Sequence, residues 1–273
     1  MDHTHILGFK EYLYQKGSSD KTIEKYLRDV KHFLTETEEI SYESLRSYRE
    51  GLIGQYAPAS VNSMIAALNQ YLTFLEMEMY KVKPVRIQKE IFARPEKELD
   101  KEEYRKLVAA ATENGDGRLA LIMEVICGTG IRVSELEYFT LEAIKNGQIR
   151  VRNKGKVRVI MIPHKLKMKL LYYAKQTKIH AGCIFITKFG NPLDRSNLWG
   201  MMKKLAAQAG VSAGKIFPHN LRHLFARTYY SFTKDISRLA DLLGHSSINT
   251  TRIYTISSGH EHQRQIEQLG LVL

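Results

Sequence analysis

The sequence predicts a mainly α-helical protein with one small antiparallel β-sheet, divided into two domains. Three observations lead to this prediction. Apolar residues recur every three or four positions through most of residues 4–75, which is the pattern of amphipathic helices. The same pattern returns in several stretches between residues 100 and 254. Residues 148–162 instead alternate between apolar and polar side chains, which is the pattern of a β-hairpin.

Residues 1–82 are predicted to form a bundle of four helices with short connections. The first helix is expected over residues 4–16, and Gly17 ends it. The other three helices are opened by residues typical of helix starts, which are Ser18 and Ser19, Ser41, and Ala57 with Pro58. The expected core residues are Ile6, Phe9, Leu13, Ile23, Tyr26, Leu27, Val30, Phe33, Leu34, Leu45, Tyr48, Leu52, Val61, Met64, Ile65, Leu68, Tyr71, Leu72 and Leu75.

Residues 83–97 are predicted to be a basic linker between the domains. The helical period fades there, and Pro84 and Pro95 interrupt the chain. Basic side chains run along and just before this segment, at Lys81, Lys83, Arg86, Lys89, Arg94 and Lys97. A linker of this composition can lie along a phosphate backbone.

Residues 98–273 are predicted to form a second domain of mixed α and β structure. Asp100 can cap its first helix, and residues 118–127 form a continuous apolar helix. Gly128-Thr129-Gly130 is expected to break that helix, because glycine lets the backbone turn sharply. A new helix is expected to start at Ser134-Glu135-Leu136.

The middle and the end of the second domain contain the remaining predicted elements. The hairpin over 148–162 turns at Asn153-Lys154-Gly155-Lys156, with Ile149, Val151, Val157, Val159 and Met161 as its apolar positions. Further elements are a third strand over 183–187, helices over 165–176 and 196–209, and a short helix over 260–269 that carries Ile266 and Leu269 on one side.

Chemically active side chains are concentrated between His219 and Tyr254. The first predicted helix there has an apolar stripe, and His219 and Arg222 share a face away from it. The stripe is formed by Leu221, Leu224, Phe225, the methyl group of Thr228, and Phe232. A second helix, with Ile236, Leu239, Ala240 and Leu243, ends at Gly244, so that His245 follows a helix end. Cationic donors, imidazoles and a phenol together suggest a site for a phosphate oxyanion and a nucleophile.

Composition narrows the class of protein. The net charge of +12 suits a polyanionic partner such as nucleic acid, although a solvated basic surface gives the same balance. The charge is uneven, because residues 1–80 hold 8 basic and 12 acidic side chains. Cys127 and Cys183 lie in apolar runs and are interpreted as buried thiols. We expect a cytoplasmic protein, since the sequence has neither a signal-peptide core nor an apolar run of about 18 residues.

Five blocks of residues, in this order, resemble those of the tyrosine recombinases, the phage-integrase family. They are Gly128 to Leu136 around Arg132, Asn153-Lys154-Gly155-Lys156, His219 to Arg222, Leu243-Gly244-His245, and Tyr254. The likeness covers most of residues 98–260 and is nearest to simple two-domain members, Xer-like or transposon-type. It implies a four-helix core-binding (SAM-like) domain over 1–82 and a catalytic domain over 98–273 with a C-terminal docking helix.

The resemblance also implies a role for each matching residue. Tyr254 would attack a DNA phosphate and form a 3′-phosphotyrosine, and Arg132 and Arg222 would bind the charged phosphate. His219 and His245 would hold its oxygens or take the tyrosine proton. Lys154 would protonate the leaving 5′ oxygen, although the sequence leaves Lys156 open for this role. Glu135 would support the site. No metal or other cofactor is implied.

The implied substrate is double-stranded DNA with paired recognition sites. Candidate phosphate contacts are Lys21, Lys25, Arg28, Lys31, Arg86 and Lys156, although each is also explained as a solvated surface residue. Members of the family act as homo-oligomers, with a dimer at each site and a tetramer in the synapse, and an accessory directionality protein is a possible partner. The apolar end Leu271-Val272-Leu273 is expected to dock into a neighbouring protomer. The target sequence, the element served, and attack by Tyr254 in cis or in trans stay open.

Three other functions share some of these features. His219 and His223 have the i, i+4 spacing of a helical metal pair, but Asn220 stands where a metallohydrolase needs glutamate. A DNA-binding regulator without chemistry explains the charge but not the ordered set of reactive residues. A type IB topoisomerase shares the chemistry, and a relaxation assay would distinguish it from a recombinase.

Overall fold

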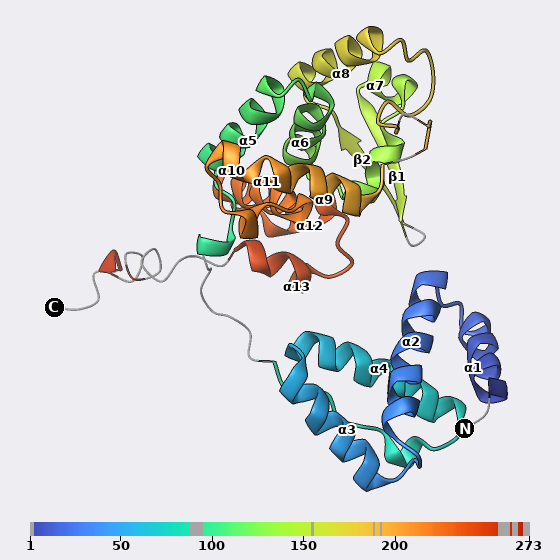
Figure 1. Cartoon of the computed structure of the whole chain (residues 1–273). Coiled ribbons are helices and arrows are strands. Elements are labelled where there is room, and N and C mark those ends of the chain that lie inside the picture. Colours follow the sequence, from blue (N-terminus) through green and yellow to red (C-terminus); the bar gives the residue numbers. More distant parts are fainter. Residues whose placement is uncertain are drawn as a thin grey trace. The chain divides into compact units, whose positions relative to one another are not determined.

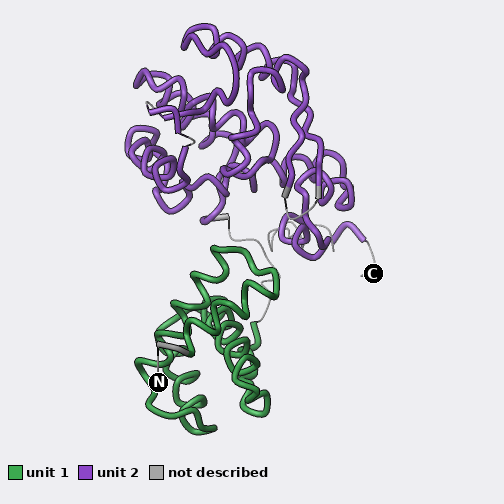
Figure 2. The backbone as a smooth tube through the Cα atoms, turned by 90° about the vertical axis from the view of Figure 1, so that its right-hand side faces the viewer, with its two compact units in different colours: residues 1–90 green, residues 91–273 purple. Residues whose placement is uncertain are grey.

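The chain folds into two compact units, residues 1–90 and 91–273, shown in green and purple in Figure 2. The computed structural model describes residues 3–87, 95–153, 156–187, 189–191 and 193–255, together with residue 263 and residues 267–269. The division between the units falls inside the predicted linker. None of the helices described has the length and apolar character needed to cross a membrane.

The first unit is the predicted bundle of four helices (Figure 1). Its helices are α1 His3–Gln15, α2 Asp20–Glu36, α3 Tyr42–Gln55 and α4 Pro58–Phe74. The predicted caps form, because Ser19 accepts a hydrogen bond from the backbone of Thr22 and Ser41 forms a capping box with Ser44. Most of the core predicted from the helical period is buried, and Phe9, Val30 and Tyr71 have no exposed surface. Some of the predicted residues, such as Ile6 and Leu75, are only partly buried at its edge.

The start of the predicted linker is fixed on the first unit. A short 3₁₀ helix, η1 Glu78–Tyr80, follows α4. The Asn69 side chain then exchanges two hydrogen bonds with the backbone of Val82, at 2.8 and 2.9 Å, and Asn62 does the same with Val85, at 2.7 and 2.9 Å. The segment that holds Val82 and Val85, where the predicted linker begins, is therefore held against α4 by paired amide contacts.

The second unit is built around helix α6 (Figure 1). Eight of its thirteen residues are buried, and α5, α8 and α11 pack on it. In chain order the described elements are η2 Pro95–Lys97, α5 Lys101–Glu113, α6 Gly117–Thr129, η3 Val133–Tyr138, α7 Leu141–Asn146, β1 Gln148–Asn153, β2 Lys156–Met161, α8 His164–Gln176, α9 Arg195–Lys204, α10 Ala206–Ala209, η4 Ala213–Lys215, α11 Pro218–Thr233, α12 Ile236–Leu243, α13 Ile248–Thr251 and η5 Arg252–Tyr254.

The predicted hairpin forms, with Gln148 opposite Met161 and Asn153 opposite Lys156. Ile149 and Val151 of β1 are buried. On β2, however, the predicted apolar positions face outward, since Val157, Val159 and Met161 are 58%, 46% and 68% exposed. The alternation of the strand consequently turns Arg158 and Ile160 toward the interior of the second unit.

Several predicted elements differ from the structure. Residues 183–187 do not form a third strand, because within the described residues Cys183 makes only an isolated bridge with Thr140. The helix predicted over 196–209 is split at Leu205 into α9 and α10. The break predicted at Gly128-Thr129-Gly130 is confirmed, because α6 continues to Thr129 and Gly130 ends it in a left-handed conformation, with φ of 67°.

Two further predictions concern the C-terminal part. The prediction that Phe232 packs on the apolar stripe of its helix is wrong, since Phe232, next to the last residue of α11, is 90% exposed. The short helix predicted over 260–269 falls mostly outside the described residues.

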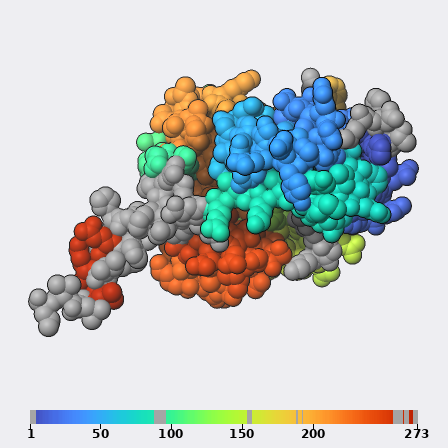
Figure 3. Space-filling model, turned by 90° about the horizontal axis from the view of Figure 1, so that it is seen from below, coloured from blue at the N-terminus to red at the C-terminus, as the bar shows by residue number. Residues whose placement is uncertain are grey.

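Helices α12 and α13, orange-red in the space-filling view, form one continuous part of the surface of the second unit (Figure 3).

Candidate active site

The glycine turn after α6 positions the first cationic group. Gly130 has φ of 67°, and a Cβ atom at this position would lie 2.3 Å from Cδ1 of Phe225. Only glycine fits here, for two reasons: the backbone has a left-handed conformation, and α11 approaches too closely to leave room for a Cβ atom. The turn buries Ile131 in the core and leaves the side chain of Arg132 31% exposed. Arg132 thus lies at the edge of the interior, where a ligand can reach its guanidinium.

Glu135 is the buried carboxylate of the site, and two arginines share it. Arg132 donates to it from its backbone N–H, at 2.7 Å, and from Nη1, at 3.1 Å. Arg158 of β2 donates from Nη1 and Nη2, at 2.9 and 2.7 Å. Burial alone would raise the pKa of Glu135, but the hydrogen bonds and charges of Arg158 and Arg132 outweigh burial and leave that pKa below its usual value. Glu135 is accordingly an anion.

Arg222 lies at the centre of the site and is only 1% exposed. Its Nη1 donates to the carbonyl oxygen of Gly130, and its Nη2 donates to the carbonyl oxygen of Leu243 at 2.8 Å. The same Nη2 lies 3.1 Å from Nε2 of His245. Arg222 was predicted on the face of its helix away from the apolar stripe, and that face is also buried, because groups from the turn at Gly130 and from the end of α12 bind its guanidinium inside the fold. Burial, and then the charge of Arg132, lower its pKa to about 10, so it is still a cation at neutral pH.

His245 is held as one neutral tautomer. Its Nε2 must accept from Arg222, because a guanidinium has no acceptor. The ring proton is then on Nδ1, which donates to Oγ1 of Thr251 at 2.9 Å. Burial, followed by the charge of Arg222 and of other nearby arginines, lowers the pKa of His245 to about 4. The imidazole is therefore uncharged at neutral pH, and both of its nitrogens are engaged in hydrogen bonds.

Tyr254 is buried beside these groups in the same chain, with 4% of its surface exposed. Its ring stacks on His245 with the ring centres 6.2 Å apart, and it meets His223 edge-on at 5.0 Å. Burial raises the pKa of the Tyr254 phenol, while the charge of Arg222 and a hydrogen bond with it oppose that rise. The phenol is protonated at neutral pH, with a cation beside it that would stabilise the phenolate.

His219 and His223 form a pair of imidazoles on α11. Their ring centres are 4.5 Å apart, and His219 is exposed whereas His223 is partly buried. Although part of its surface is exposed, the ring of His219 loses water to the protein atoms around it, and this loss, followed by the charge of Arg222, lowers its pKa. Burial, and then His219, lower the pKa of His223 to about 4. Within the described residues, no group of three or more His, Cys, Asp or Glu side chains is arranged to hold a metal ion.

Five of the six predicted catalytic residues lie among the described residues, and they gather around Arg222. These five are Arg132, His219, Arg222, His245 and Tyr254. Lys154 lies outside the described residues, and of Lys156 only the backbone, at the start of β2, is described.

The predicted DNA contacts on α2 differ from one another. Lys21 and Lys31 are exposed, whereas Lys25 forms an ion pair with Asp29, which is only 7% exposed. Arg28 lies 3.5 Å from the same carboxylate. Arg86 is exposed on the segment that follows α4.

The sequence analysis does not predict two residues that belong to the site, Arg158 and Thr251. Arg158 carried a usable signal, because it alternates in phase with the buried Ile160 on a strand of the predicted hairpin. Thr251 carried none, since a threonine in a polar run gives no indication that it is fully buried and bound to His245.

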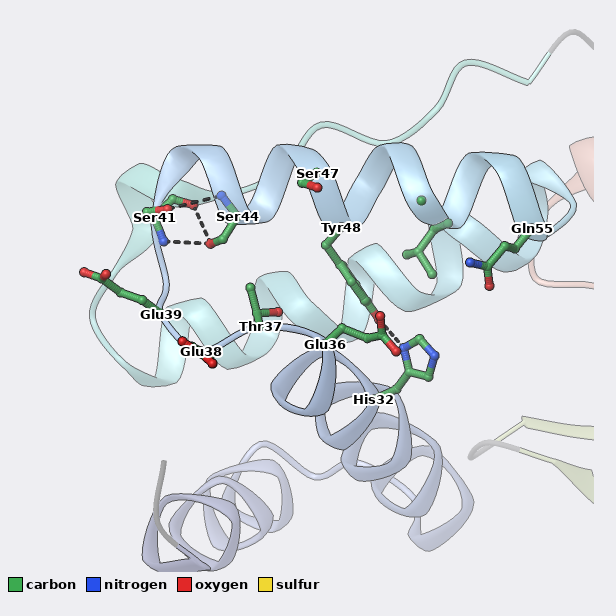
Figure 4. A pocket seen from close by; sticks show the side chains of 12 residues that line it. His32, Glu36, Thr37, Glu38, Glu39, Ser41, Ser44, Ser47, Tyr48 and Gln55 are labelled. Carbon is green, nitrogen blue, oxygen red and sulfur yellow. Dashed lines mark hydrogen bonds between the residues drawn. The ribbon is translucent and has the colours of Figure 1, made fainter.

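A separate hollow lies in the first unit, between the end of α2 and α3 (Figure 4). It encloses about 530 Å³, and His32 and Tyr48, joined by a 2.9 Å hydrogen bond, lie along it. Its twelve lining residues include three glutamates and no lysine or arginine. This hollow lacks the cations that a phosphate site requires, and it contains none of the predicted site residues.

Comparisons with known proteins agree on one family. Residues 97–261 match the model of the phage integrase family, and residues 6–79 match the phage integrase N-terminal SAM-like domain. Tyrosine recombinase XerA of Pyrococcus horikoshii is 30% identical over 97% of this chain and 93% of its own length.

Two solved structures have a similar fold. A lambda integrase (75–356) dimer bound to a COC′ core site has a TM-score of 0.75 at 21% identity and covers 94% of this chain and 96% of its own. A lambda integrase tetramer bound to a Holliday junction has a TM-score of 0.72 at 23% identity, over 92% of this chain and 76% of its own.

Proposed function

The chain belongs to the phage integrase family and is a tyrosine recombinase, an enzyme that cleaves and rejoins DNA; from this we propose that Tyr254 is its nucleophile and that Arg132 and Arg222 bind the scissile phosphate. The observation that supports this assignment is the set of contacts made by Arg222. One buried guanidinium contacts the turn before Arg132 and the histidine that stacks on Tyr254. A phosphate beside Tyr254 would therefore meet cations on more than one side.

In the proposed reaction the Tyr254 oxygen attacks phosphorus and the bond to the 5′ oxygen breaks. A 3′-phosphotyrosine and a free 5′ hydroxyl result. Arg132 and Arg222 stabilise the negative charge that builds on the nonbridging oxygens. The reverse attack by a 5′ hydroxyl on the phosphotyrosine rejoins a strand, because the ester retains the energy of the broken bond.

Two proton transfers accompany cleavage. The phenol proton passes to a neutral imidazole, and His219 and His245 are the two candidates because their lowered pKa values leave both rings mostly uncharged at neutral pH. To take this proton, His245 must first release the hydrogen bond that its Nε2 accepts from Arg222. The leaving 5′ oxygen gains a proton from Lys154, which follows β1 in the sequence, with Lys156 as the second candidate. The positive charge of Arg222 favours loss of the phenol proton.

Residues 1–82 are proposed to grip DNA as the core-binding domain, and residues 98–273 to perform the chemistry. On α2, Lys21 and Lys31 are the better candidates for phosphate contacts, because Asp29 already neutralises Lys25. Arg86 is a further candidate. Double-stranded DNA with paired sites is the proposed substrate, and the cytoplasm, where such DNA lies, is the proposed location.

The oligomers seen for lambda integrase support an assembly of the same kind here. We infer a dimer at each recognition site and a tetramer in the synapse. The C-terminal residues 271–273 would dock into the apolar groove between α5 and α11 of a neighbouring copy. Tyr104, Leu224 and the exposed Phe232 line this groove, which encloses about 420 Å³. An accessory directionality protein is a further proposed partner.

A suicide-substrate assay tests this function. Nicked duplexes drawn from a library of candidate sites would trap the covalent adduct, and sequencing would identify the trapped DNA. The wild-type protein should form adducts, and Tyr254→Phe should form none while binding the same DNA. Adducts in the Tyr254→Phe variant would exclude Tyr254 as the nucleophile.

A further inference from the structure

The carboxylate of Glu135 is fully occupied by hydrogen bonds. Oε1 accepts from Nη1 of Arg132 and Nη1 of Arg158, and Oε2 accepts from the backbone N–H of Arg132 and Nη2 of Arg158. A carboxylate offers about four lone-pair positions, two on each oxygen. All of them are used here, and Arg158 takes two in the parallel, two-pronged geometry that arginine forms with carboxylates.

Because Arg158 shares the carboxylate, the Arg132 guanidinium forms few hydrogen bonds with Glu135. Only one N–H of the Arg132 guanidinium bonds to the carboxylate, although the group has five. Its side chain is 31% exposed, whereas that of Arg158 is 12% exposed. If Arg158 were removed, two acceptor positions on a buried anion would open next to Arg132. Its guanidinium would then turn inward to form the two-pronged pair itself.

Arg158 also contacts the turn that precedes His245. A Cβ atom on Gly244 would lie 2.6 Å from Nη1 and 2.9 Å from Cδ of Arg158, so the guanidinium lies directly against the backbone of Gly244. Gly244 ends α12 with φ of 63°. One side chain from the hairpin thus contacts both the carboxylate that holds Arg132 and the turn that carries His245.

We propose that Arg158 is a positioning residue for the recombination reaction. It fills the two remaining positions on Glu135, which keeps the Arg132 guanidinium directed at the phosphate, and it supports the turn before His245. This inference rests on the proposed function, because it assumes that Arg132 binds the scissile phosphate. It also makes the orientation of Arg132 depend on the hairpin that carries Lys154.

The test measures single-turnover adduct formation and DNA affinity for matched variants. Arg158→Met keeps the length of the side chain but removes its donors, and we expect adduct formation to slow about 100-fold with DNA affinity unchanged within about threefold. Arg158→Lys keeps the positive charge but cannot form two parallel hydrogen bonds with a carboxylate, and it should slow adduct formation about 10-fold. Arg150→Met, on the exposed side of the same hairpin, is the control and should match the wild type.

The double variant Arg158→Met/Glu135→Gln separates positioning from general damage. A neutral amide at position 135 cannot attract the Arg132 guanidinium by charge. The double variant should therefore form adducts about 10-fold faster than Arg158→Met alone. A double variant no faster than Arg158→Met would overturn the inference, as would a wild-type rate in Arg158→Met. If the wild type itself formed no adduct on any substrate, the proposed function would fail instead.

Discussion

Nη2 of Arg222 lies 3.1 Å from Nε2 of His245, and this contact decides which nitrogen of the imidazole carries the proton. Because the arginine can only donate, the proton is on Nδ1, where Thr251 accepts it at 2.9 Å. A buried cation of the site and a neutral imidazole are thereby linked by a hydrogen bond.

Thr251→Val should slow adduct formation about 10-fold, because it removes the acceptor that holds the His245 ring in place, a loss of about 1 kcal/mol or slightly more. Binding of DNA should be unchanged. Thr250→Val, at the neighbouring exposed position, is the matched control. Single-turnover rates on a nicked substrate measure the effect, and equal rates for the two variants would show that the Thr251 contact has no part in the reaction.

Gly130→Ala should destabilise the second unit by about 2–4 kcal/mol, from backbone strain together with a clash against Phe225. Gly210→Ala is the control, since Gly210 also has positive φ, at 62°, but a Cβ there would meet nothing within 4 Å. Its cost should be about 1–2 kcal/mol from strain alone. Urea unfolding followed by the fluorescence of Trp199, the single tryptophan of the chain, reports on this unit. Equal costs would refute the predicted clash.

Stability of the second unit should fall as the pH drops from about 6.5 toward 4. His223 and His245 have folded-state pKa values of about 4, below their usual value. In this window the unfolded chain binds protons that the folded chain does not, so stability is present above about pH 6.5 and is lost as the pH falls. His223→Gln should flatten the dependence, while the exposed His180→Gln should not. Urea midpoints measured between pH 4 and 8 provide the check.

Lys21→Gln and Lys31→Gln should each weaken DNA binding and reduce the slope of log K against log salt by about one, as expected for the loss of a phosphate contact. Lys25→Gln should have a smaller effect, because Asp29 already pairs with Lys25. Lys10→Gln on α1 serves as the control for charge alone. If all four variants gave the same salt slope, α2 would not be the face that meets DNA.

Phe232→Ser should weaken assembly of copies on DNA without changing the fold, since Phe232 is 90% exposed at the rim of the groove between α5 and α11. Tyr172→Ser, which is 66% exposed on α8, is the control for loss of a surface aromatic group. Gel-shift assays on one-site and two-site DNA would resolve the assemblies. Normal assembly by Phe232→Ser would exclude this groove as the docking site.

The sequence by itself determined most of the helices and the identity of the reactive groups. Helix starts at Ser19, Ser41 and Asp100 could be predicted because a cap depends on residues within one turn. The ends at Gly130 and Gly244 follow from glycine tolerating a left-handed backbone. Such features depend on neighbours along the chain, and a sequence displays them directly.

Only the tertiary structure decided how those groups are connected. Arg222 is buried because Gly130 and Leu243, 92 and 21 positions away, supply carbonyl oxygens for its guanidinium. Arg158 reaches Glu135 across 23 positions because the alternation of β2 turns it inward. The third strand failed for the same reason, since strand pairing depends on a partner distant in sequence. A local pattern can show that a side chain such as Arg158 faces inward, but the partner it meets there is set by packing.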